Sequence, residues 1–112
     1  MKRGTILLVG LDPTVGQEQR GTRPCIMVSD DVATEHQRFP VIVVVPLTST
    51  ALRGPLYPAI EATSKSGLKN RSYALLDQVR AIDKSRAVKA YGSVSKAEIG
   101  AIDAGLRQLL GL

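Results

Sequence analysis

Five consecutive apolar residues, Val41 to Val45, constrain the fold more than any other stretch of the chain. The run is too short and too rich in β-branched side chains for a helix, so it predicts a strand that is buried on both faces. Pro46 has no N–H to donate to a strand ladder, which places the end of the strand at Leu47 and Thr48. We therefore take this segment as the central strand of a sheet.

Shorter strands are predicted before and after this run, because apolar or alternating residues recur between turn-rich segments. A long polar loop separates the first two of these strands, and a basic loop occupies residues 62–71. Residues 30–39 are polar and show no periodic pattern. The predicted strands cover residues 5–11, 25–29, 57–61, 72–76, 78–82 and 87–92.

A terminal helix is predicted from Ser95, because Ser95 and Glu98 have the spacing of a capping box and Gly111 suits the C-cap. Gly100 and Gly105 each weaken a helix by roughly 1 kcal/mol, so packing has to hold it. One apolar stripe follows the helical period and predicts a core or dimer contact: Ile99, Ile102, Leu106, Leu109 and Leu110.

Five to seven short strands with one closing helix predict a single domain over residues 1–112, of the α+β class and mostly β. The expected architecture is a small, mostly antiparallel barrel closed by the C-terminal helix. A chain of 112 residues is small enough that dimerisation would help to bury its apolar surface.

Several classes of site and location are excluded by composition. The single cysteine, Cys25, excludes an intramolecular disulfide and suits a buried position in a strand. The single histidine, His36, lies in a polar segment, so we expect a solvated loop residue, no metal site and no cofactor. The apolar run from Ile6 to Val9 is too short for a secretory signal, which predicts a soluble, cytoplasmic protein that does not bind membranes.

The basic charge of the chain is concentrated in its second half. The formal net charge is +5, and residues 53–89 alone hold eight Lys or Arg against three Asp or Glu. This excess predicts either a polyanionic partner or a solvated basic face. Base stacking on an aromatic platform would have to use arginine planes or one of four rings: Phe39, Tyr57, Tyr73 and Tyr91.

The loop from Leu11 to Arg23, with the sequence LDPTVGQEQRGTR, is longer than the about two to five residues of an ordinary hairpin connection. Its glycines, turn signals and polar side chains favour a functional loop. Pro24 disfavours the α region for the residue before it, so Arg23 should be extended, with its guanidinium at the mouth of the strand that starts at Cys25.

Arginine, hydroxyl and carboxylate side chains suit a phosphoryl transfer that needs no metal, and RNA carries its own nucleophile in the 2′-hydroxyl. Arg23 fits the role of the phosphate clamp. Glu18 would accept the 2′-proton or orient Arg23, and Thr48 would hydrogen-bond the phosphate. The simpler alternatives are an ion pair of Glu18 with Arg20 and a strand-end side-chain turn at Thr48.

Four segments occur in a fixed order along the chain: Leu11-Asp12-Pro13, Gly16 to Pro24, Val45 to Thr50 and Leu75 to Asp83. Together they resemble the MazF/PemK family of toxin endoribonucleases of type II toxin-antitoxin systems. The resemblance implies a homodimeric SH3-like barrel in the style of CcdB and Kid. It also implies a metal-independent, sequence-selective endoribonuclease, or mRNA interferase, that acts on single-stranded RNA and leaves 2′,3′-cyclic phosphate and 5′-hydroxyl ends.

The resemblance further implies neutralisation by a cognate antitoxin, an acidic and partly disordered peptide. It maps the family's arginine and threonine onto Arg23 and Thr48, its loop glutamate onto Glu18 and the aspartate of its D-Q-x-R segment onto Asp77. We predict RNA contacts from the side chains of these segments and of the basic stretch: Gln17, Gln19, Arg20, Thr22, Ser49, Thr50, Arg53, Lys69, Asp77, Gln78 and Arg80.

The chain also departs from the family pattern. Thr5 and Leu8 stand where an acidic and an aromatic residue are common, Gln17 replaces a serine, and no histidine base lies near the first loop. The arginine–threonine scheme therefore carries over better than a histidine scheme. Two alternatives are a gyrase-binding toxin like CcdB, which would not need Arg23, and a non-catalytic RNA-binding module.

Overall fold

Strand β3 (Val41–Thr48) lies at the centre of the sheet in the computed structural model, which describes residues 2–31 and 40–112. One edge of β3 pairs with β2 (Thr22–Met27). The other edge pairs first with β6 (Arg80–Asp83) and then, at Leu47 and Thr48, with β5 (Ser72–Ala74). The predicted central strand and its end at Thr48 are therefore confirmed, and the carbonyl of Pro46 accepts the amide of Leu75 at 2.9 Å.

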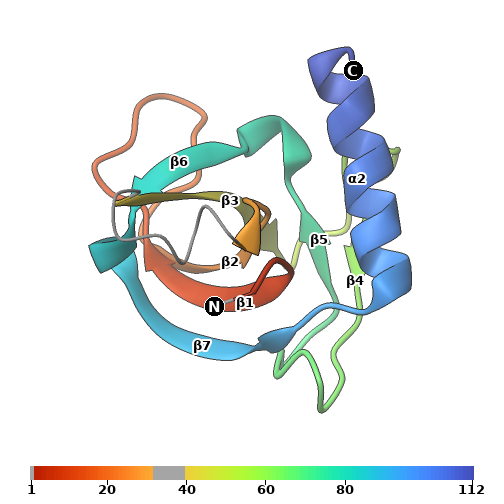
Figure 1. The fold of residues 1–112 in the computed structure, drawn as a ribbon, viewed down its shortest axis with the longest axis horizontal. Helices are drawn as coiled ribbons and strands as arrows, with labels where there is room; N and C mark the ends of the chain where they lie inside the picture. The colour runs from red at the N-terminus through yellow and green to blue at the C-terminus, as the bar shows by residue number, and fades with distance from the viewer. Residues whose placement is uncertain (1, 32–39) are drawn as a thin grey trace.

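The complete sheet runs in the order β4–β5–β3–β2–β1–β7, with β6 paired to β3, and every pair is antiparallel. Figure 1 shows that the sheet curls into a half-barrel, with α2 standing beside β4 and β5. This architecture confirms the predicted mostly-β fold. The remaining elements are β1 (Thr5–Gly10), β4 (Ala59–Ile60), β7 (Ala87–Ser93) and the short 3₁₀ helices η1 (Leu76–Gln78) and η2 (Lys84–Arg86).

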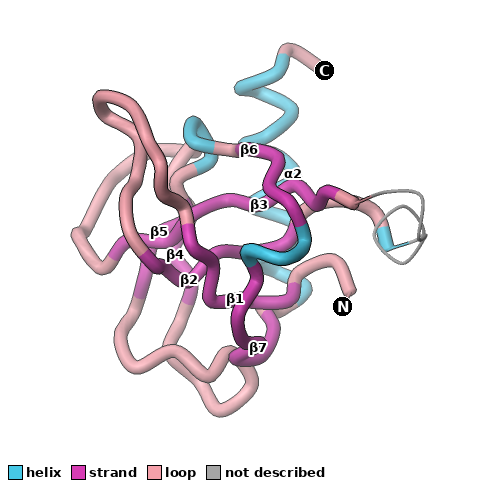
Figure 2. The backbone as a smooth tube through the Cα atoms, turned by 90° about the vertical axis from the view of Figure 1, so that its left-hand side faces the viewer, coloured by secondary structure: helices cyan, strands magenta, loops and turns pink. Residues whose placement is uncertain are grey.

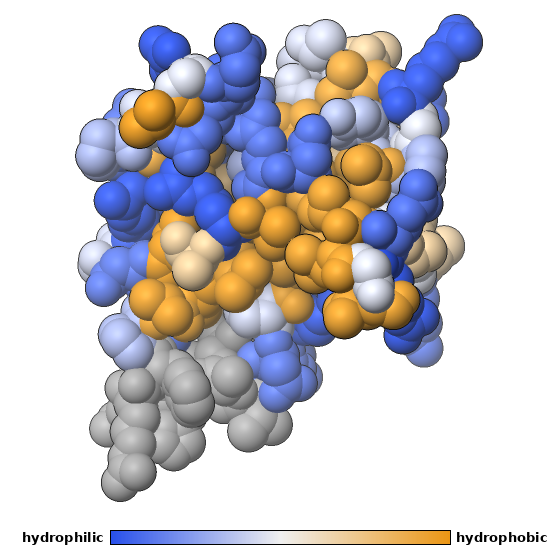
Figure 3. Space-filling view, turned by 90° about the horizontal axis from the view of Figure 1, so that it is seen from above, coloured by the Kyte–Doolittle hydropathy of each residue, from blue (hydrophilic) through white to orange (hydrophobic). Residues whose placement is uncertain are grey.

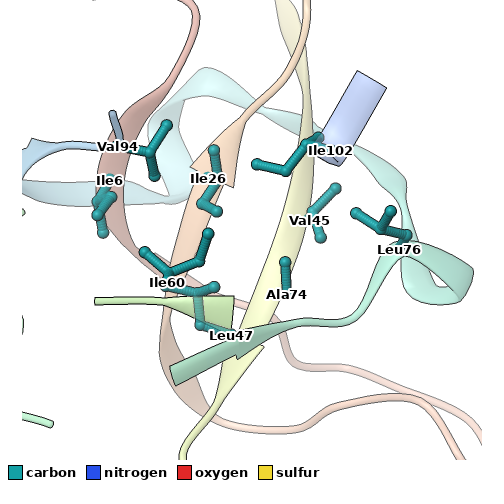
Figure 4. Packing of buried hydrophobic residues seen from close by; sticks show 9 residues of the cluster. All are labelled: Ile6, Ile26, Val45, Leu47, Ile60, Ala74, Leu76, Val94 and Ile102. Carbon is teal, nitrogen blue, oxygen red and sulfur yellow. The ribbon is translucent and has the colours of Figure 1, made fainter. Parts of the chain in front are cut away.

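Alternate residues of β3 enter two separate apolar clusters, because successive side chains point to opposite faces of a strand. Ile42 and Val44 join a cluster with residues of β1, β2 and β6. Val45 and Leu47 join a second cluster, which α2 covers (Figure 4). The prediction of two buried faces thus holds from Ile42 to Leu47, apart from the half-buried Val43.

Helix α2 (Lys96–Leu110) begins and ends as predicted. The Glu98 amide donates to Ser95 Oγ at 3.1 Å, the Ser95 amide donates to Glu98 Oε1 at 2.8 Å, and Gly111 has a left-handed φ of 71°. Ile102 is fully buried in the second cluster, whereas Leu110 is 58% exposed. Among the helices that the structure describes, none has the length and apolar character needed to cross a membrane.

Several strand boundaries differ from the predicted ones: β4 covers only Ala59–Ile60, and β5 ends at Ala74. Two further differences bear on the site. Strand β2 starts at Thr22 rather than at Cys25, and Arg23 pairs with Val9 inside the ladder, because the hairpin with β1 continues up to the loop neck. The segment predicted as a strand from residue 78 instead opens with η1, so β6 begins at Arg80. The predictions for His36 and Phe39 concern residues outside the described segments.

Candidate active site

Arg23 and Thr48 line the same surface cleft, which has a volume of about 310 Å³. Their strands are neighbours: Cys25 lies opposite Pro46, and the antiparallel register continued by two residues brings Arg23 opposite Thr48. The predicted proximity of these two residues is therefore confirmed. The rest of the cleft, called the clamp cleft below, is lined by Pro24, Leu47, Ser49, Gly67, Leu68, Lys69, Asn70, Ser72 and Tyr91.

The guanidinium of Arg23 makes a hydrogen bond to the protein through one nitrogen, and its other two nitrogens can bind a ligand. Its Nε donates to the carbonyl of Arg20 at 3.0 Å, and the residue as a whole is exposed. Within the described part of the chain, neither Nη atom has a hydrogen-bond or ion-pair partner. A fixed, exposed guanidinium with two free nitrogens is suited to bidentate contact with a phosphate.

Thr48 offers a hydroxyl at the point where β3 ends. Its Oγ1 accepts the amide of Thr50 at 3.2 Å, which is the strand-end side-chain turn considered above. That contact uses an oxygen lone pair and leaves the hydroxyl proton free to donate. The turn and a phosphate contact are therefore compatible at this residue.

A second cleft, of about 360 Å³, also meets the end of β3 and is called the loop cleft below. Pro46 lines the loop cleft, whereas the next two residues, Leu47 and Thr48, line the clamp cleft. Consecutive residues at the end of β3 thus line two neighbouring clefts. The loop cleft brings together the predicted catalytic residue Glu18 and predicted RNA-contacting residues from the long loop, η1 and β6: Gln17, Gln19, Asp77, Gln78 and Arg80.

The long loop is closed at its neck and tied to η1. At the neck, the Leu11 amide donates to the Gly21 carbonyl at 2.9 Å. Gln78 holds the far part, since its Oε1 accepts the Gln19 amide at 2.7 Å and its Nε2 donates to the Gln17 carbonyl at 3.2 Å. Figure 2 shows this loop projecting on the side of the sheet away from the N-terminus. Gln78 therefore serves as a staple for the loop as well as a wall of the loop cleft.

Two arginines hold the backbone at the start of the loop. Arg80 Nη1 donates to the Leu11 carbonyl at 3.2 Å, and Arg86 Nη1 donates to the Asp12 carbonyl at 3.0 Å. The Arg80 guanidinium is thus engaged with protein, although the residue also lines the loop cleft. The sequence gives no signal for Arg86, because its partner lies 74 residues away along the chain.

Glu18 lies apart from Arg23. Its Oε1 accepts the Val15 amide at 2.5 Å, and the residue lines the loop cleft rather than the clamp cleft. The orienting contact on Arg23 comes instead from the Arg20 carbonyl. Arg20 in turn donates to the Gly16 carbonyl at 3.3 Å, and no ion pair between Glu18 and Arg20 is present among the described residues.

The other predicted residues fall around these two clefts. Asp77 Oδ2 accepts the hydroxyl of Tyr57 at 2.8 Å, a contact that raises the pKa of that phenol. Ser49 and Lys69 line the clamp cleft. Four of the predicted residues are exposed and line neither cleft: Arg20, Thr22, Thr50 and Arg53. Over residues 2–31 and 40–112, no group of three His, Cys, Asp or Glu side chains is arranged to hold a metal ion.

Cys25 follows Arg23 and Pro24 in β2 and points into the apolar interior. It is fully buried, and burial raises the pKa of its thiol to about 12, with the charge of Arg80 opposing that rise. The predicted buried role of this cysteine is confirmed. A thiol held neutral and buried contributes packing to the cluster that contains Ile42 and Val44 rather than nucleophilic chemistry.

Curated relatives resemble the chain over its whole length. The chain is 35% identical over 116 residues to Endoribonuclease MazF9 of Mycobacterium tuberculosis, covering 100% of this chain and 98% of the relative. It is 29% identical to Endoribonuclease EndoA of Bacillus subtilis, covering 100% and 96% of the two chains.

Solved structures share the fold. A crystal structure of MazF from Deinococcus radiodurans superimposes with a TM-score of 0.85 at 22% identity, covering 100% of this chain and 97% of that one. An endoribonuclease in complex with its cognate antitoxin, from a mycobacterial species, gives a TM-score of 0.81 at 24% identity, covering 100% and 96%. The model of the PemK-like, MazF-like toxins of type II toxin-antitoxin systems matches residues 2–110, so the chain belongs to this family.

Proposed function

We propose that the chain is an endoribonuclease toxin that cuts single-stranded RNA, typically mRNA, without a metal ion and with selectivity for sequence. The observation that carries the proposal is the shared cleft of Arg23 and Thr48, in a family whose relatives are named endoribonucleases. The 2′-oxygen attacks the adjacent phosphorus and the bond to the 5′-oxygen breaks. The products are a 2′,3′-cyclic phosphate and a 5′-hydroxyl end.

In this reaction Arg23 binds the non-bridging oxygens of the scissile phosphate through its two free nitrogens. Charge builds on those oxygens as the fifth bond to phosphorus forms, and a guanidinium fixed in place stabilises that charge without reorganisation. The hydroxyl of Thr48 donates a second hydrogen bond from the opposite strand. Together the two side chains orient the phosphate for attack by the neighbouring 2′-oxygen.

One proton leaves the 2′-hydroxyl and one reaches the departing 5′-oxygen. We propose Glu18 as the acceptor, as the resemblance to the family suggests. This role requires its carboxylate to leave the Val15 amide and reach across the end of β3 when RNA occupies both clefts. The substitution Glu18→Gln tests the role through the pH profile. If Glu18 is the base, the cleavage rate of the variant no longer falls at low pH as the wild-type rate does. If Glu18 only holds the loop, the variant keeps the same fall in rate at low pH.

The central test is cleavage of a long RNA in EDTA, with both ends of the products mapped. Arg23→Ala and Thr48→Ala should each lower the cleavage rate, by roughly 100- to 1,000-fold for the arginine. Arg71→Ala is the matched control, because this exposed arginine pairs with Glu61 at 2.7 Å and lines neither cleft. Wild-type protein that cuts no RNA in EDTA would refute the proposal.

The same variants separate the alternatives. A gyrase-binding toxin would keep its toxicity in Arg23→Ala, whereas a toxin acting by RNA cleavage would lose it. A non-catalytic RNA-binding module would bind RNA, and lose affinity in Arg23→Ala, without producing cut ends from wild-type protein.

Two partners belong to the proposal. One is a cognate antitoxin with an acidic, partly disordered segment, which would compete with RNA for the basic side chains of the clefts. A relative in fold has been solved with its antitoxin. Purified protein should therefore lose RNA cleavage when an acidic peptide from the cognate antitoxin is added, and should regain cleavage at high RNA concentration.

The other partner is a second copy of the chain. Figure 3 shows an apolar area across the middle of one face. Separately, the exposed apolar side chains among the described residues include Val41, which is 46% exposed, and Leu110, which is 58% exposed. Burial of such an area in a dimer is favourable by about 25 cal/mol per Å². Sedimentation should give a dimer for the wild type and a monomer for Leu110→Asp, while the exposed polar control Gln108→Asp stays dimeric.

A further inference from the structure

Four aromatic rings are available to stack on an RNA base, and the structure distinguishes three of them. The hydroxyl of Tyr57 is committed to Asp77, and the ring of Tyr73 carries the Arg71 guanidinium at 5.6 Å. Neither residue lines a cleft. Tyr91 is different, because it lines the clamp cleft together with Arg23 and Thr48.

Tyr91 is set into the cleft rather than lying loose on the surface. The residue is half-buried and packs against the cluster beneath α2. The ammonium of the exposed Lys89 lies 5.5 Å from the ring centroid, so the ring is accessible to an outside group. Its hydroxyl has no hydrogen-bond partner among the residues that the structure describes.

The basic loop beside Tyr91 is held in place by two close backbone approaches. A Cβ at Gly67 would lie 2.5 Å from the Tyr91 carbonyl oxygen, and a Cβ at Gly92 would lie 2.1 Å from the Lys65 carbonyl oxygen. The Ser93 amide also donates to that Lys65 oxygen at 2.9 Å. The basic loop therefore docks directly on β7, and this docking shapes the clamp cleft beside Tyr91.

We propose that Tyr91 is a specificity-determining residue, which stacks on the one unpaired RNA base next to the phosphate held by Arg23 and Thr48. The inference rests on the proposed function and deepens it. Stacking needs a π-face within one nucleotide of the clamp, and Tyr91 is the aromatic residue that lines this cleft. The ammonium of Lys89 then moves from the ring face to a neighbouring phosphate.

If one base stacks on Tyr91 in the clamp cleft, the bases on the other side of the scissile phosphate enter the loop cleft. Both clefts meet the end of β3, at Pro46 and at Leu47 and Thr48, so an RNA strand that places its phosphate on Thr48 would offer one neighbouring base to each cleft. The loop cleft offers amide and carboxylate groups, which hydrogen-bond base edges, whereas the clamp cleft adds an aromatic ring to its polar side chains. The two neighbours are thus selected by different chemistry.

The test is a coupling measurement on RNA that cannot be cut. Oligonucleotides carry one 2′-deoxynucleotide at the mapped cleavage position, and an abasic nucleotide is moved through the remaining positions one at a time. Binding is measured for wild type, Tyr91→Phe and Tyr91→Leu. Tyr73→Leu is the control, because Ser72 lines the cleft and Tyr73 does not, so the latter side chain lies off the cleft.

We expect one abasic position, next to the cleavage site, to weaken wild-type binding by roughly 5- to 150-fold. The same position should have no effect on Tyr91→Leu, which already lacks the ring, and should keep its effect on Tyr91→Phe and Tyr73→Leu. Equal losses in wild type and Tyr91→Leu at every position would overturn the inference. If Tyr91→Leu does not fold, crosslinking of wild type to 5-iodouridine RNA replaces it, and a crosslink absent from Tyr91 overturns the inference.

The stacking role of Tyr91 and the proposed nuclease activity can fail independently of each other. Wild type that cuts RNA but shows no coupling at Tyr91 refutes the base site and leaves the nuclease proposal intact. If wild type instead cuts no RNA but binds it, unmodified RNA oligonucleotides are scanned with the abasic nucleotide. An abasic position that then weakens binding of wild type but not of Tyr91→Leu refutes the nuclease and supports base stacking on Tyr91.

Discussion

Gly100 and Gly105 lie in the same helix and give opposite predictions for the same substitution. A Cβ at Gly100 would meet nothing within 4 Å, so Gly100→Ala should stabilise the protein by about 0.5–1 kcal/mol through helix propensity alone. A Cβ at Gly105 would lie 2.3 Å from Leu76 Cδ1 and 2.6 Å from the Pro55 carbonyl oxygen. The second contact is with backbone, so relief requires α2 to move.

The cost of that movement sets the size of the effect. Overpacking of a filled site typically costs about 1–3 kcal/mol, and the propensity gain is common to both variants. The free energy of unfolding should therefore differ by about 1–3 kcal/mol between Gly100→Ala and Gly105→Ala. For a chain of 112 residues, with an unfolding entropy of about 2.1 cal/mol/K per residue, this is a gap in Tm of about 4–13 °C.

The assay is thermal unfolding followed by circular dichroism, at one protein concentration for both variants because any dimer links Tm to concentration. Urea unfolding gives the free energies independently. Equal stabilities for the two variants would refute the argument that α2 approaches the segment at Pro55 too closely for a side chain at position 105.

Three further outcomes test the site and its surroundings. Cys25, with a thiol pKa of about 12, should resist iodoacetamide at pH 8 in the folded protein and react in urea; rapid labelling of native protein would contradict its burial. Gln78→Leu should speed hydrogen exchange at the Gln19 amide, whereas the exposed control Gln108→Leu should not. The salt dependence of RNA binding should fall by about 0.7 in log–log slope for Arg23→Ala, and an unchanged slope would remove its phosphate contact.

The elements that local rules predicted best were those with strong local causes. The β-branched run from Val41 to Val45 and the capping box at Ser95 each contain their own structural signal, and both elements formed as expected. The start of β2 was predicted three residues late, because Thr22 and Arg23 look like loop residues until their pairing with β1 is known. Register is a property of two segments, so one segment alone does not reveal it.

The site residues differ in the same way, according to whether local sequence or distant contacts set their positions. Arg23 and Thr48 were predicted to hold one phosphate, and the neighbouring strands β2 and β3 bring them to one cleft. Glu18 was placed with Arg23 because the two are close in sequence, yet the loop carries its carboxylate into the other cleft. The contacts that set this path, Gln78 and Arg86 on the loop backbone, span 59 and 74 residues and have no local signature.

The two halves of the site differ in what holds them, and this difference bears on how selectivity can change. Arg23 and Thr48 stand on strands whose neighbours, including Cys25, Ile26 and Val45, are fully buried, so the position of the phosphate clamp is tied to the core. The walls that meet the bases are loops, held by a few side-chain bonds and two glycine contacts. Substitutions in those loops alter base contacts at little cost to the core, whereas a shift of the clamp would require the sheet itself to repack.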